Sequence, residues 1–347
     1  MTDSQTPVNF AVVGLGMGHG RAGLCTQTQG AHLAAVCDTD EARGKKAATE
    51  HNTEWVAEYD KLLERPDVDV VFLLTPSGMH AEMGMAAART GKHVACTKPI
   101  DVRLEAIDKL IRACDEAGVM LACDFDERYN PAKRRVRRAI DAGLFGPLIM
   151  LEARLKWYRT DEYFEGWHGT WQYDGGGSLM NQSVHLIDLL QWFGGPVEEV
   201  YGRMGIYNHD IETEDAAAAT VRFASGALGV IVGTTTFPEN RVFEIEVHGP
   251  KGAAALGSVN GEYLKLVGEG GDEAPAPEEP PAPEWEPSNI FEDVVSHLRR
   301  GTPLACTGVE ARKSVELILA VYTSAIENRA VRLPLDGFTP PASPIKP

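Results

Sequence analysis

The sequence predicts a two-part chain: a doubly wound α/β part with a parallel sheet, followed by an α+β part with a mainly antiparallel sheet. Three observations predict it. Up to about Phe125, short apolar runs alternate with amphipathic stretches, and the first run leads into a glycine-rich turn. Beyond Pro131, strand-like runs follow one another with short turns between them. At 347 residues the chain is long enough for two domains, each with its own hydrophobic core.

The first part is expected to contain buried strands separated by helices. Near-continuous apolar runs of this kind are typical of a parallel sheet that is covered on both faces. The expected strands are Phe10–Val13, Leu33–Cys37, Val68–Leu74, His93–Cys96 and Val119–Cys123, with helices that include Ala81–Thr90 and Leu104–Ala117. We assign residues 1–127 to this domain.

A strand, a glycine turn and a helix open this domain. Such a turn lets a pyrophosphate approach backbone N–H groups at a helix N-terminus. The next strand ends on Asp38, where a carboxylate accepts two ribose hydroxyls and repels a 2′-phosphate. His19 stands at the place of the third glycine of the usual pattern. We therefore expect the cofactor NAD rather than NADP, bound by Gly14, Leu15, Gly16, Met17, Gly18 and Asp38.

The second part is expected to form an antiparallel sheet with helices on one face. The expected helices are Ala132–Ala142, the stretch after Gly177, Ile290–Arg300 and Val309–Asn328. The expected strands are Leu148–Tyr158, Val197–Tyr207, Ala216–Phe223, Ala227–Thr236, Val242–Val247 and Tyr263–Val267. Hairpin-type turns are expected at Ser225-Gly226, Pro250-Lys251-Gly252 and Asn260-Gly261. We assign residues 128–336 to this domain and residues 337–347 to a proline-rich tail.

Polar residues follow three strands of the first part. In doubly wound sheets, ligands bind beyond the carboxyl ends of the strands. Lys98 lies between an apolar strand and Pro99, whose ring fixes the backbone and so aims the lysine side chain. A lysine beside a bound cofactor is placed to carry a proton or to donate to a substrate oxygen. The candidate cofactor-binding residues at these strand ends are Thr75, Pro76, Ser77, His80, Thr97 and Lys98, and Arg128 is a candidate for the substrate.

A glycine triplet, Gly175–Gly177, precedes a helical pattern in the second part. Asn181, His185 and Asp188 fall at i, i+4 and i+7 of that pattern, which places them on one face of an α-helix. An amide, an imidazole and a carboxylate behind a glycine turn suit a site that binds hydroxyls and moves a proton. The alternative is a polar helix face that happens to carry a histidine.

Composition narrows the classes of partner. The net charge of −17 disfavours nucleic acid and anionic membranes as partners, and no apolar run approaches the length of a membrane span. The basic run from Lys133 to Arg138 lies in a helical stretch, where a solvated or subunit-facing surface is the favoured interpretation. The cysteines have no metal-ligand spacing and are expected to be reduced core residues. We expect a cytoplasmic protein without a metal site.

Five motifs then occur in a familiar order: Gly14-x-Gly16, Asp38, Thr75-Pro76-x-x-x-His80, Thr97-Lys98-Pro99, and Gly175-Gly176-Gly177 through His185. From Phe10 to about Arg332 the chain resembles the Gfo/Idh/MocA family of oxidoreductases, which includes glucose–fructose oxidoreductase and inositol dehydrogenase. The resemblance implies a Rossmann domain followed by an open-faced, mainly antiparallel sheet domain that also mediates oligomers. It implies a dehydrogenase acting on CH–OH groups of a sugar, glycoside or cyclitol.

The resemblance also assigns roles to residues. Lys98 matches the lysine of the family's Glu-Lys-Pro motif, and His185 matches the histidine of the second-domain helix, so these two are the expected catalytic residues. The chain departs from the family pattern at Thr97, where the motif has Glu, and at Asn181, where an Asp is common. An Asn hydrogen-bonds a hydroxyl or an imidazole but supplies no charge. The expected substrate-binding residues are Lys98, Arg128, Trp157, Tyr158, Arg159, His168, Asn181 and His185.

Three interpretations remain open at this point. The first is an NAD-dependent dehydrogenase in which Lys98 and His185 handle the hydroxyl proton. The second is a glycoside-cleaving enzyme that uses NAD for transient oxidation and elimination. The third is a regulatory protein that senses the dinucleotide without catalysis, which the presence of both Lys98 and His185 disfavours. In each case we expect a homodimer or homotetramer, because helices are too few to cover both faces of the second sheet.

Overall fold

The computed structural model describes the chain except for residues 1–5, 258–261, 269–277 and 344–347. The chain divides into two compact units: residues 1–126 with 287–311, and residues 127–286 with 312–347. The segment 287–311, which the sequence places in the second domain, therefore belongs to the first unit. Phe291 accounts for this, since its ring packs edge-on against Phe10 at 5.0 Å and Phe72 at 5.6 Å between centroids.

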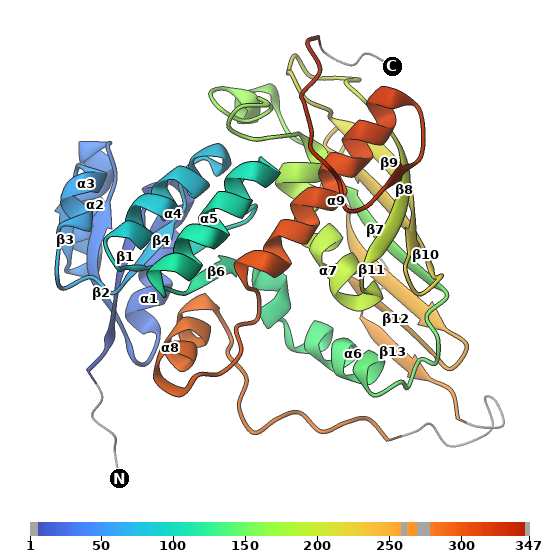
Figure 1. Cartoon of the computed structure of the whole chain (residues 1–347), viewed down its shortest axis with the longest axis horizontal. Coiled ribbons are helices and arrows are strands. Elements are labelled where there is room, and N and C mark those ends of the chain that lie inside the picture. The colour runs from blue at the N-terminus through green and yellow to red at the C-terminus, as the bar shows by residue number, and fades with distance from the viewer. Residues whose placement is uncertain (1–5, 258–261, 269–277, 344–347) are drawn as a thin grey trace. The chain divides into compact units, whose positions relative to one another are not determined.

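The first unit contains a six-stranded sheet in the order β3-β2-β1-β4-β5-β6, and every strand pair in it is parallel. The predicted doubly wound sheet is confirmed, with β3 as an additional short edge strand. Helices α1 to α5 and α8 belong to the same unit (Figure 1). The strands are β1 (Val8–Val13), β2 (Ala31–Cys37), β3 (Glu54–Val56), β4 (Val70–Leu73), β5 (His93–Thr97) and β6 (Leu121–Asp124). The helices are α1 (Leu15–Gln27), α2 (Glu41–His51), α3 (Tyr59–Leu63), α4 (His80–Arg89), α5 (Leu104–Ala117) and α8 (Ile290–Arg300).

The second unit contains an eight-stranded sheet in the order β13-β12-β11-β7-β10-β9-β8-β14. Among the described strands of this sheet only β7 and β10 pair in parallel, so the predicted mainly antiparallel sheet is confirmed. The strands are β7 (Met150–Lys156), β8 (Val197–Gly205), β9 (Ala216–Phe223), β10 (Leu228–Thr234), β11 (Val242–Gly249), β12 (Gly252–Gly257), β13 (Tyr263–Leu266) and β14 (Val331–Arg332). The helices are α6 (Pro131–Asp141), α7 (Val184–Gly194) and α9 (Gly308–Glu327), whose first turn lies in the first unit.

Alternating burial along the strands gives this sheet two different faces. Ala217, Ala219, Val221 and Phe223 of β9 are buried, whereas the residues between them are half-buried or exposed. Helices α6, α7 and α9 lie on one side of the sheet in Figure 1. Every second residue of β9 is therefore buried, as expected for an antiparallel sheet that has helices packed on one face.

Two of the three predicted hairpin turns, and part of the predicted tail, lie within the described residues. Chain reversals at Ser225-Gly226 and Pro250-Lys251-Gly252 join β9 to β10 and β11 to β12. The expected turn at Asn260-Gly261 lies outside the described residues. Within the predicted tail, Phe338 packs near Trp171 and Tyr322, at 5.7 Å and 6.0 Å between ring centroids, so at least this part of it contributes to the second unit.

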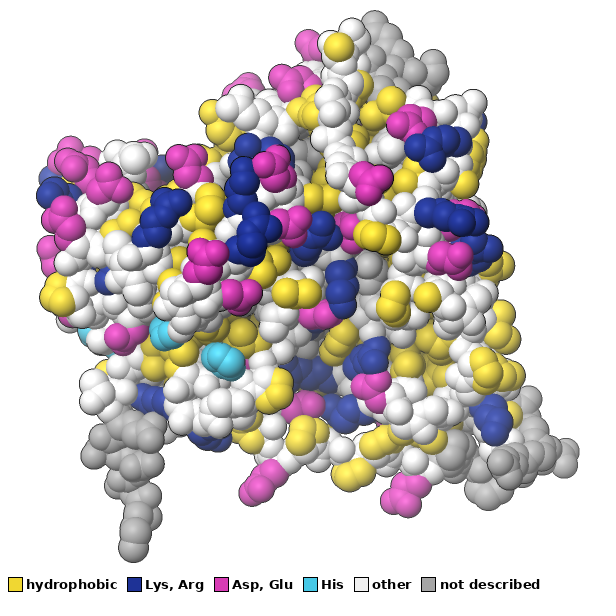
Figure 2. Space-filling view, viewed as in Figure 1, with side chains coloured by type: hydrophobic (Ala, Val, Ile, Leu, Met, Phe, Trp, Pro, Cys, Tyr) yellow, Lys and Arg dark blue, Asp and Glu magenta, His cyan; other side chains and the backbone are white. Residues whose placement is uncertain are grey.

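The basic run on α6 is paired within its own unit. Its acidic partners among the described residues include Glu127, Asp141, Glu279 and Glu286. Acidic and basic side chains are interspersed on the face drawn in Figure 2. These contacts make the run part of an intramolecular ion-pair network rather than an uncompensated cationic surface.

All six cysteines are buried, and none of them forms a disulfide within the described structure. Burial raises the pKa of the Cys25 and Cys114 thiols to about 12, which keeps both in the neutral form. Among the described residues, no helix is long and apolar enough to cross a membrane.

Candidate functional site

Gly14 and Gly16 in the turn after β1 differ in what surrounds them. Gly14 has φ of +87°, and a Cβ there would lie 2.8 Å from the carbonyl carbon and oxygen of Leu74. A Cβ at Gly16 would meet nothing within 4 Å. The fold therefore requires glycine at position 14, whereas the space at Gly16, in the first turn of α1, is available to a ligand.

Asp38 follows the carboxyl end of β2 and is almost fully buried. Its carboxylate accepts hydrogen bonds from the backbone N–H of Leu15 (2.7 Å) and Asp40 (2.8 Å). Arg43 donates to both carboxylate oxygens from Nε (2.9 Å) and Nη2 (2.8 Å). Burial opposes ionisation, but these donors outweigh it and hold the pKa of Asp38 below its usual value. An ionised carboxylate thus stands beside the glycine turn, with a half-exposed arginine directly against it.

His80 joins two of the strand-end loops. Its ring is fully buried, with Nδ1 2.9 Å from the carbonyl oxygen of Pro99 and Nε2 2.8 Å from that of Thr75. Burial lowers the pKa of this imidazole, although both carbonyl contacts oppose the shift. From the sequence, His80 is a cofactor-binding candidate. Both ring nitrogens lie against backbone carbonyl oxygens, so the ring holds the loop at Thr75 against the loop at Pro99.

Lys98 is half-buried at the end of β5. Its positive charge acts to lower the pKa of both His80 and Asp124, which places the ammonium group within electrostatic reach of both. Asp124, at the end of β6, is fully buried, and burial raises the pKa of its carboxyl to about 6 although Arg21 lies 2.8 Å away. Lys98 therefore belongs to a cluster of ionisable groups at the carboxyl edge of the parallel sheet.

The other predicted residues of this edge differ in exposure. Ser77 and Thr97 are buried, whereas Pro76 and Thr75 are half-buried. Met17 is exposed, with 59% of its surface accessible. The structure thus brings the strand-end candidates of the first unit to one edge of the sheet, and it leaves the glycine turn and Lys98 more accessible than Ser77, His80 and Thr97.

In the second unit the glycine triplet does not lead directly into an α-helix. Residues Ser178–Ser183 form a π-helix, and the α-helix α7 begins only at Val184. Hydrogen bonds in a π-helix span one residue more than in an α-helix, and such turns are frequent at functional sites. The predicted single polar face of Asn181, His185 and Asp188 is therefore wrong in its spacing. Asp188 is buried against Arg128 and Ser314.

A buried carboxylate holds the start of this π-helix. Glu214 accepts hydrogen bonds from the backbone N–H of Gly177 (2.9 Å) and Leu179 (2.8 Å) and from the hydroxyl of Tyr322 (2.9 Å). Burial raises the pKa of Glu214 to about 7, and these donors oppose the rise. A Cβ at Gly177 would lie 1.7 Å from the carbonyl oxygen of Glu214, so only glycine allows this approach.

Asn181 lies at the centre of a polar network. Its Nδ2 donates to Asp174 and lies 3.1 Å from Nδ1 of His168, while its Oδ1 accepts from Tyr163 Oη (3.2 Å) and from Gln182 (3.0 Å). Asp174 is 1% exposed. Position 181 has no carboxylate of its own, but Asp174 places one beside it. Asp174 contacts Asn181 and lies 3.6 Å from Nδ1 of His168.

Several predicted substrate residues border this network. The guanidinium of Arg159 lies over the rings of Trp157 (4.8 Å) and Tyr163 (5.2 Å) and donates to Gln182 (2.9 Å). Tyr163 stacks on His168 at 4.3 Å between centroids. The structure therefore brings Trp157, Arg159, His168 and Asn181 together around Tyr163. An aromatic and polar surface of this kind suits the ring faces and hydroxyl rims of a saccharide.

The remaining predicted residues have other surroundings. His185 is half-buried, and its ring lies 6.4 Å from that of Phe243, against which Trp157 also stacks at 5.6 Å. Tyr158 has 43% of its surface exposed. Arg128 is buried and forms a bidentate ion pair with Asp188, which joins the segment before α6 to α7.

Residues absent from the predicted set complete these arrangements. Asp174 immediately precedes the glycine triplet, which was the available signal for it in the sequence. Tyr163 and Gln182 lie within a few residues of predicted positions. Glu214 and Phe243 reach the site from loops and strands far along the chain, and no local pattern marks them.

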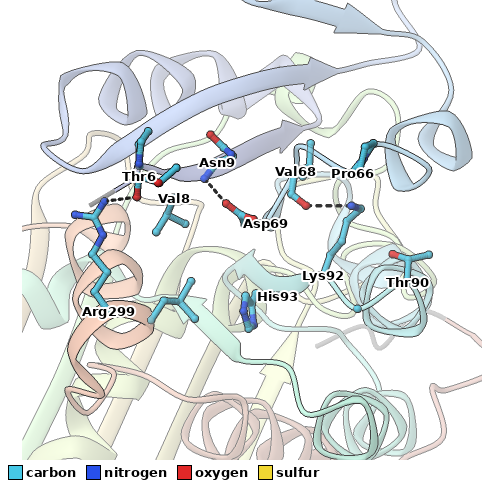
Figure 3. Close-up of a pocket in the computed structure, with 13 residues that line it drawn as sticks. Thr6, Val8, Asn9, Pro66, Val68, Asp69, Thr90, Lys92, His93 and Arg299 are labelled. Carbon is cyan, nitrogen blue, oxygen red and sulfur yellow. Dashed lines mark hydrogen bonds between the residues drawn. The ribbon is translucent and has the colours of Figure 1, made fainter. Parts of the chain in front are cut away.

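A separate cavity of about 610 Å³ lies at the opposite edge of the first sheet, at the amino ends of β1 and β5 (Figure 3). Its polar groups are engaged within the unit. Lys92 donates to the carbonyl oxygens of Arg65 (2.6 Å) and Val68 (3.0 Å), and Asp69 accepts from the backbone of Asn9 (2.8 Å). The cavity is therefore distinct from the carboxyl edge where the glycine turn lies, and we assign no ligand to it.

Comparison with known proteins gives two family matches. Residues 8–125 match the family described as oxidoreductase family, NAD-binding Rossmann fold. Residues 134–255 match the GFO/IDH/MocA C-terminal domain. The two matches fall in the first and second units respectively.

Individual relatives extend the similarity over most of the chain. The WlbA dehydrogenase from Bordetella pertussis, solved in complex with NADH and UDP-GlcNAcA, is 31% identical with a TM-score of 0.85, covering 95% of this chain and 100% of that one. The 1,5-anhydro-D-fructose reductase of Ensifer adhaerens is 30% identical over 88% of this chain and 92% of its own length. The scyllo-inositol 2-dehydrogenase (NAD(+)) of Bacillus subtilis (strain 168) is 28% identical over 75% of this chain and 77% of its own length.

The difference between the glycines predicts how each variant behaves. Gly16→Ala should leave the melting temperature near that of the wild type but weaken NADH binding about tenfold or more, because a methyl group displaces a pyrophosphate from the turn. Gly14→Ala should lower stability by about 1–2 kcal/mol or more, since an L-residue is strained at positive φ. Fluorescence titration with NADH and thermal unfolding measure the two effects.

Gly20→Ala is the matched control, since a Cβ there also meets nothing within 4 Å and the residue lies on the same helix. It should bind NADH as the wild type does. Unchanged NADH binding by Gly16→Ala, or equal weakening by Gly20→Ala, would remove the glycine turn from the cofactor site.

Proposed function

Because the chain belongs to the Gfo/Idh/MocA family of oxidoreductases, we propose that it is an NAD-dependent dehydrogenase of a sugar, glycoside or cyclitol. It oxidises a secondary hydroxyl or reduces the corresponding ketone. The observation that carries this proposal is the carboxyl edge of the first sheet. There the open space at Gly16, the ionised Asp38 and Lys98 follow the carboxyl ends of strands β1, β2 and β5 of the same parallel sheet. Relatives that are named as reductases and dehydrogenases of sugars and inositols support the substrate class.

The residues present fit the cofactor in kind. The N-terminus of α1 offers backbone N–H groups to a pyrophosphate. Asp38 would accept ribose hydroxyls in place of the half-exposed Arg43 guanidinium, which now donates to both of its oxygens. Bound by these groups, NAD would supply a nicotinamide ring as the acceptor of a hydride. The chain's own residues are left with binding the sugar and with removing the hydroxyl proton.

We propose that Lys98 and His185 together remove the hydroxyl proton. Lys98 lies among ionisable groups at the edge of the first sheet, and His185 lies in the first turn of α7, beyond the π-helix. The network around Asn181 binds the substrate's other hydroxyls in this scheme, with Trp157 and Tyr163 supplying apolar ring surface. Asp174 provides the negative charge that Asn181 lacks.

The first experiment is incubation of the purified protein with NAD and a panel of substrates. The panel contains inositols, anhydro-sugars and UDP-linked sugar acids, the classes that the names of the relatives indicate. Net formation of NADH at 340 nm with one class is the expected result. Turnover of a glycoside without net NADH would instead favour transient oxidation and elimination, and NADH binding without turnover of any member would favour a dinucleotide sensor.

The catalytic pair makes a second prediction. Positioned proton transfer contributes about 10²–10⁴-fold to the rate, so Lys98→Ala and His185→Ala should each lower kcat by that factor while NADH still binds. Asn181→Ala should act mainly by raising KM. Lys61→Ala and His32→Ala are matched controls, since both are exposed surface residues. Near-full turnover by both Lys98→Ala and His185→Ala would show that the assignment is wrong.

The contacts of Asp38 and Arg43 predict the cofactor preference. The wild type should have a higher kcat/KM with NAD than with NADP, because the Asp38 carboxylate repels a 2′-phosphate. Asp38→Asn should reduce this preference. Arg43→Ala should increase it, because the guanidinium against Asp38 is the group able to compensate a 2′-phosphate.

Steady-state kinetics with both cofactors measure these ratios, and Lys45→Ala, on the exposed side of α2, is the control. A wild-type enzyme at least as efficient with NADP would contradict the assignment of Asp38.

We also propose that the chain forms a homodimer or homotetramer through the second sheet. Helices cover one side of that sheet in Figure 1, and the other side carries half-buried residues such as Val230 and Val232. A second copy of the chain packed against this side would remove these apolar side chains from water. Light scattering at micromolar concentration should report a dimer or tetramer, and a monomer would exclude the proposal.

A further inference from the structure

Two helices of the first unit bring two histidines and a glutamate together away from the proposed catalytic residues. His19 lies in α1, and Glu50 and His51 are the last two residues of α2. One ring nitrogen of each histidine and one carboxylate oxygen of Glu50 all lie within 4.8 Å of one another. Nε2 of His19 is 2.8 Å from Oε2 of Glu50, and the two imidazole rings are 5.3 Å apart between centroids.

The surroundings of the three side chains leave ligand atoms available. Nε2 of His51 is buried and has no hydrogen-bond partner within the described part of the chain. A buried polar nitrogen without a partner is costly, and a metal ion is one of the groups that satisfies it. The ring of His51 lies against Gly23 of α1, where a Cβ would be 3.4 Å from Cε1. Lys46 lies 3.9 Å from Oε1 of Glu50, so Oε2 remains directed toward His19.

The donor set identifies the class of ion. Two imidazoles and one carboxylate are a common zinc-binding combination, with metal–ligand distances of about 2.0–2.2 Å. Ligand atoms around a tetrahedral zinc ion are then about 3.3 Å apart, so atoms within 4.8 Å need only small side-chain rotations to close on the ion. Magnesium and calcium, which prefer an all-oxygen set, do not fit.

We propose that His19, Glu50 and His51 bind one Zn²⁺ ion per chain, with water completing the coordination. The ion joins α1, which begins at the glycine turn, to α2, which begins just after Asp38. The expectation of no metal site rested on the cysteine spacing alone. His19 and His51 are far apart in the sequence, with the rest of α1, strand β2 and most of α2 between them. The site lies in the first unit and does not depend on the identity of the substrate.

The test is titration of ZnCl₂ into untagged, chelator-treated full-length protein by isothermal calorimetry, with metal content measured after dialysis. One Zn²⁺ per chain with micromolar or tighter affinity is expected, and saturation should raise the melting temperature by about 5 °C. Glu50→Gln, at an exposed position, should weaken binding by more than about 100-fold, since even loss of an outer-shell partner costs 10–100-fold. His51→Gln and His19→Gln should do the same.

His32→Gln is the matched control, because His32 is an exposed histidine of the same unit outside the cluster. It should bind Zn²⁺ as the wild type does. NADH binding by each variant reports that the unit is folded. No zinc binding by the wild type would overturn the proposal, and so would equal affinity in Glu50→Gln and the wild type. If His32→Gln also lost the ion, the site would lie elsewhere on the surface.

Discussion

The carboxylate of Glu214 is the contact on which the geometry of the second unit's site depends. It accepts from two backbone N–H groups at the start of the π-helix and from the hydroxyl of Tyr322 on α9. Because Glu214 is 2% exposed, water cannot replace these donors, and loss of any of them would leave a buried carboxylate short of partners. The glycine triplet, the π-helix and α9 are therefore held together, and the position of Asn181 follows from that arrangement.

In the first unit, buried polar side chains also hold loops together at the carboxyl edge of the parallel sheet. Asp38 joins the glycine turn to the start of α2, and His80 joins the loops that follow β4 and β5. Each of these side chains is buried, and their partners are largely backbone groups. Lys98 differs, since it is only half-buried. Fixed polar groups thus position the loops at this edge of the first sheet.

Local patterns predicted the sheets and most helices because burial imposes a period on apolar residues. They failed where that signal is absent. Strand β12 contains a run of alanines and glycines, and β3 and β14 are very short, so none has a β-branched run. The placement of α8 in the first unit and the contacts of Glu214 and Asp174 depend on tertiary packing. Sequence order alone does not determine such contacts, and the histidine–glutamate cluster between α1 and α2 is of the same kind.

The π-helix has a consequence for how insertions and deletions would act on this chain. Each residue of an α-helix turns the chain by about 100°. Removal of Gln182 or Ser183 would therefore restore regular α-helical spacing and rotate everything before it by that angle. Asn181 would turn away from Asp174 while His185 kept its place. The extra residue of the π-helix therefore changes the register between Asn181 and α7. The length of this segment, more than its composition, determines which side chains face the network.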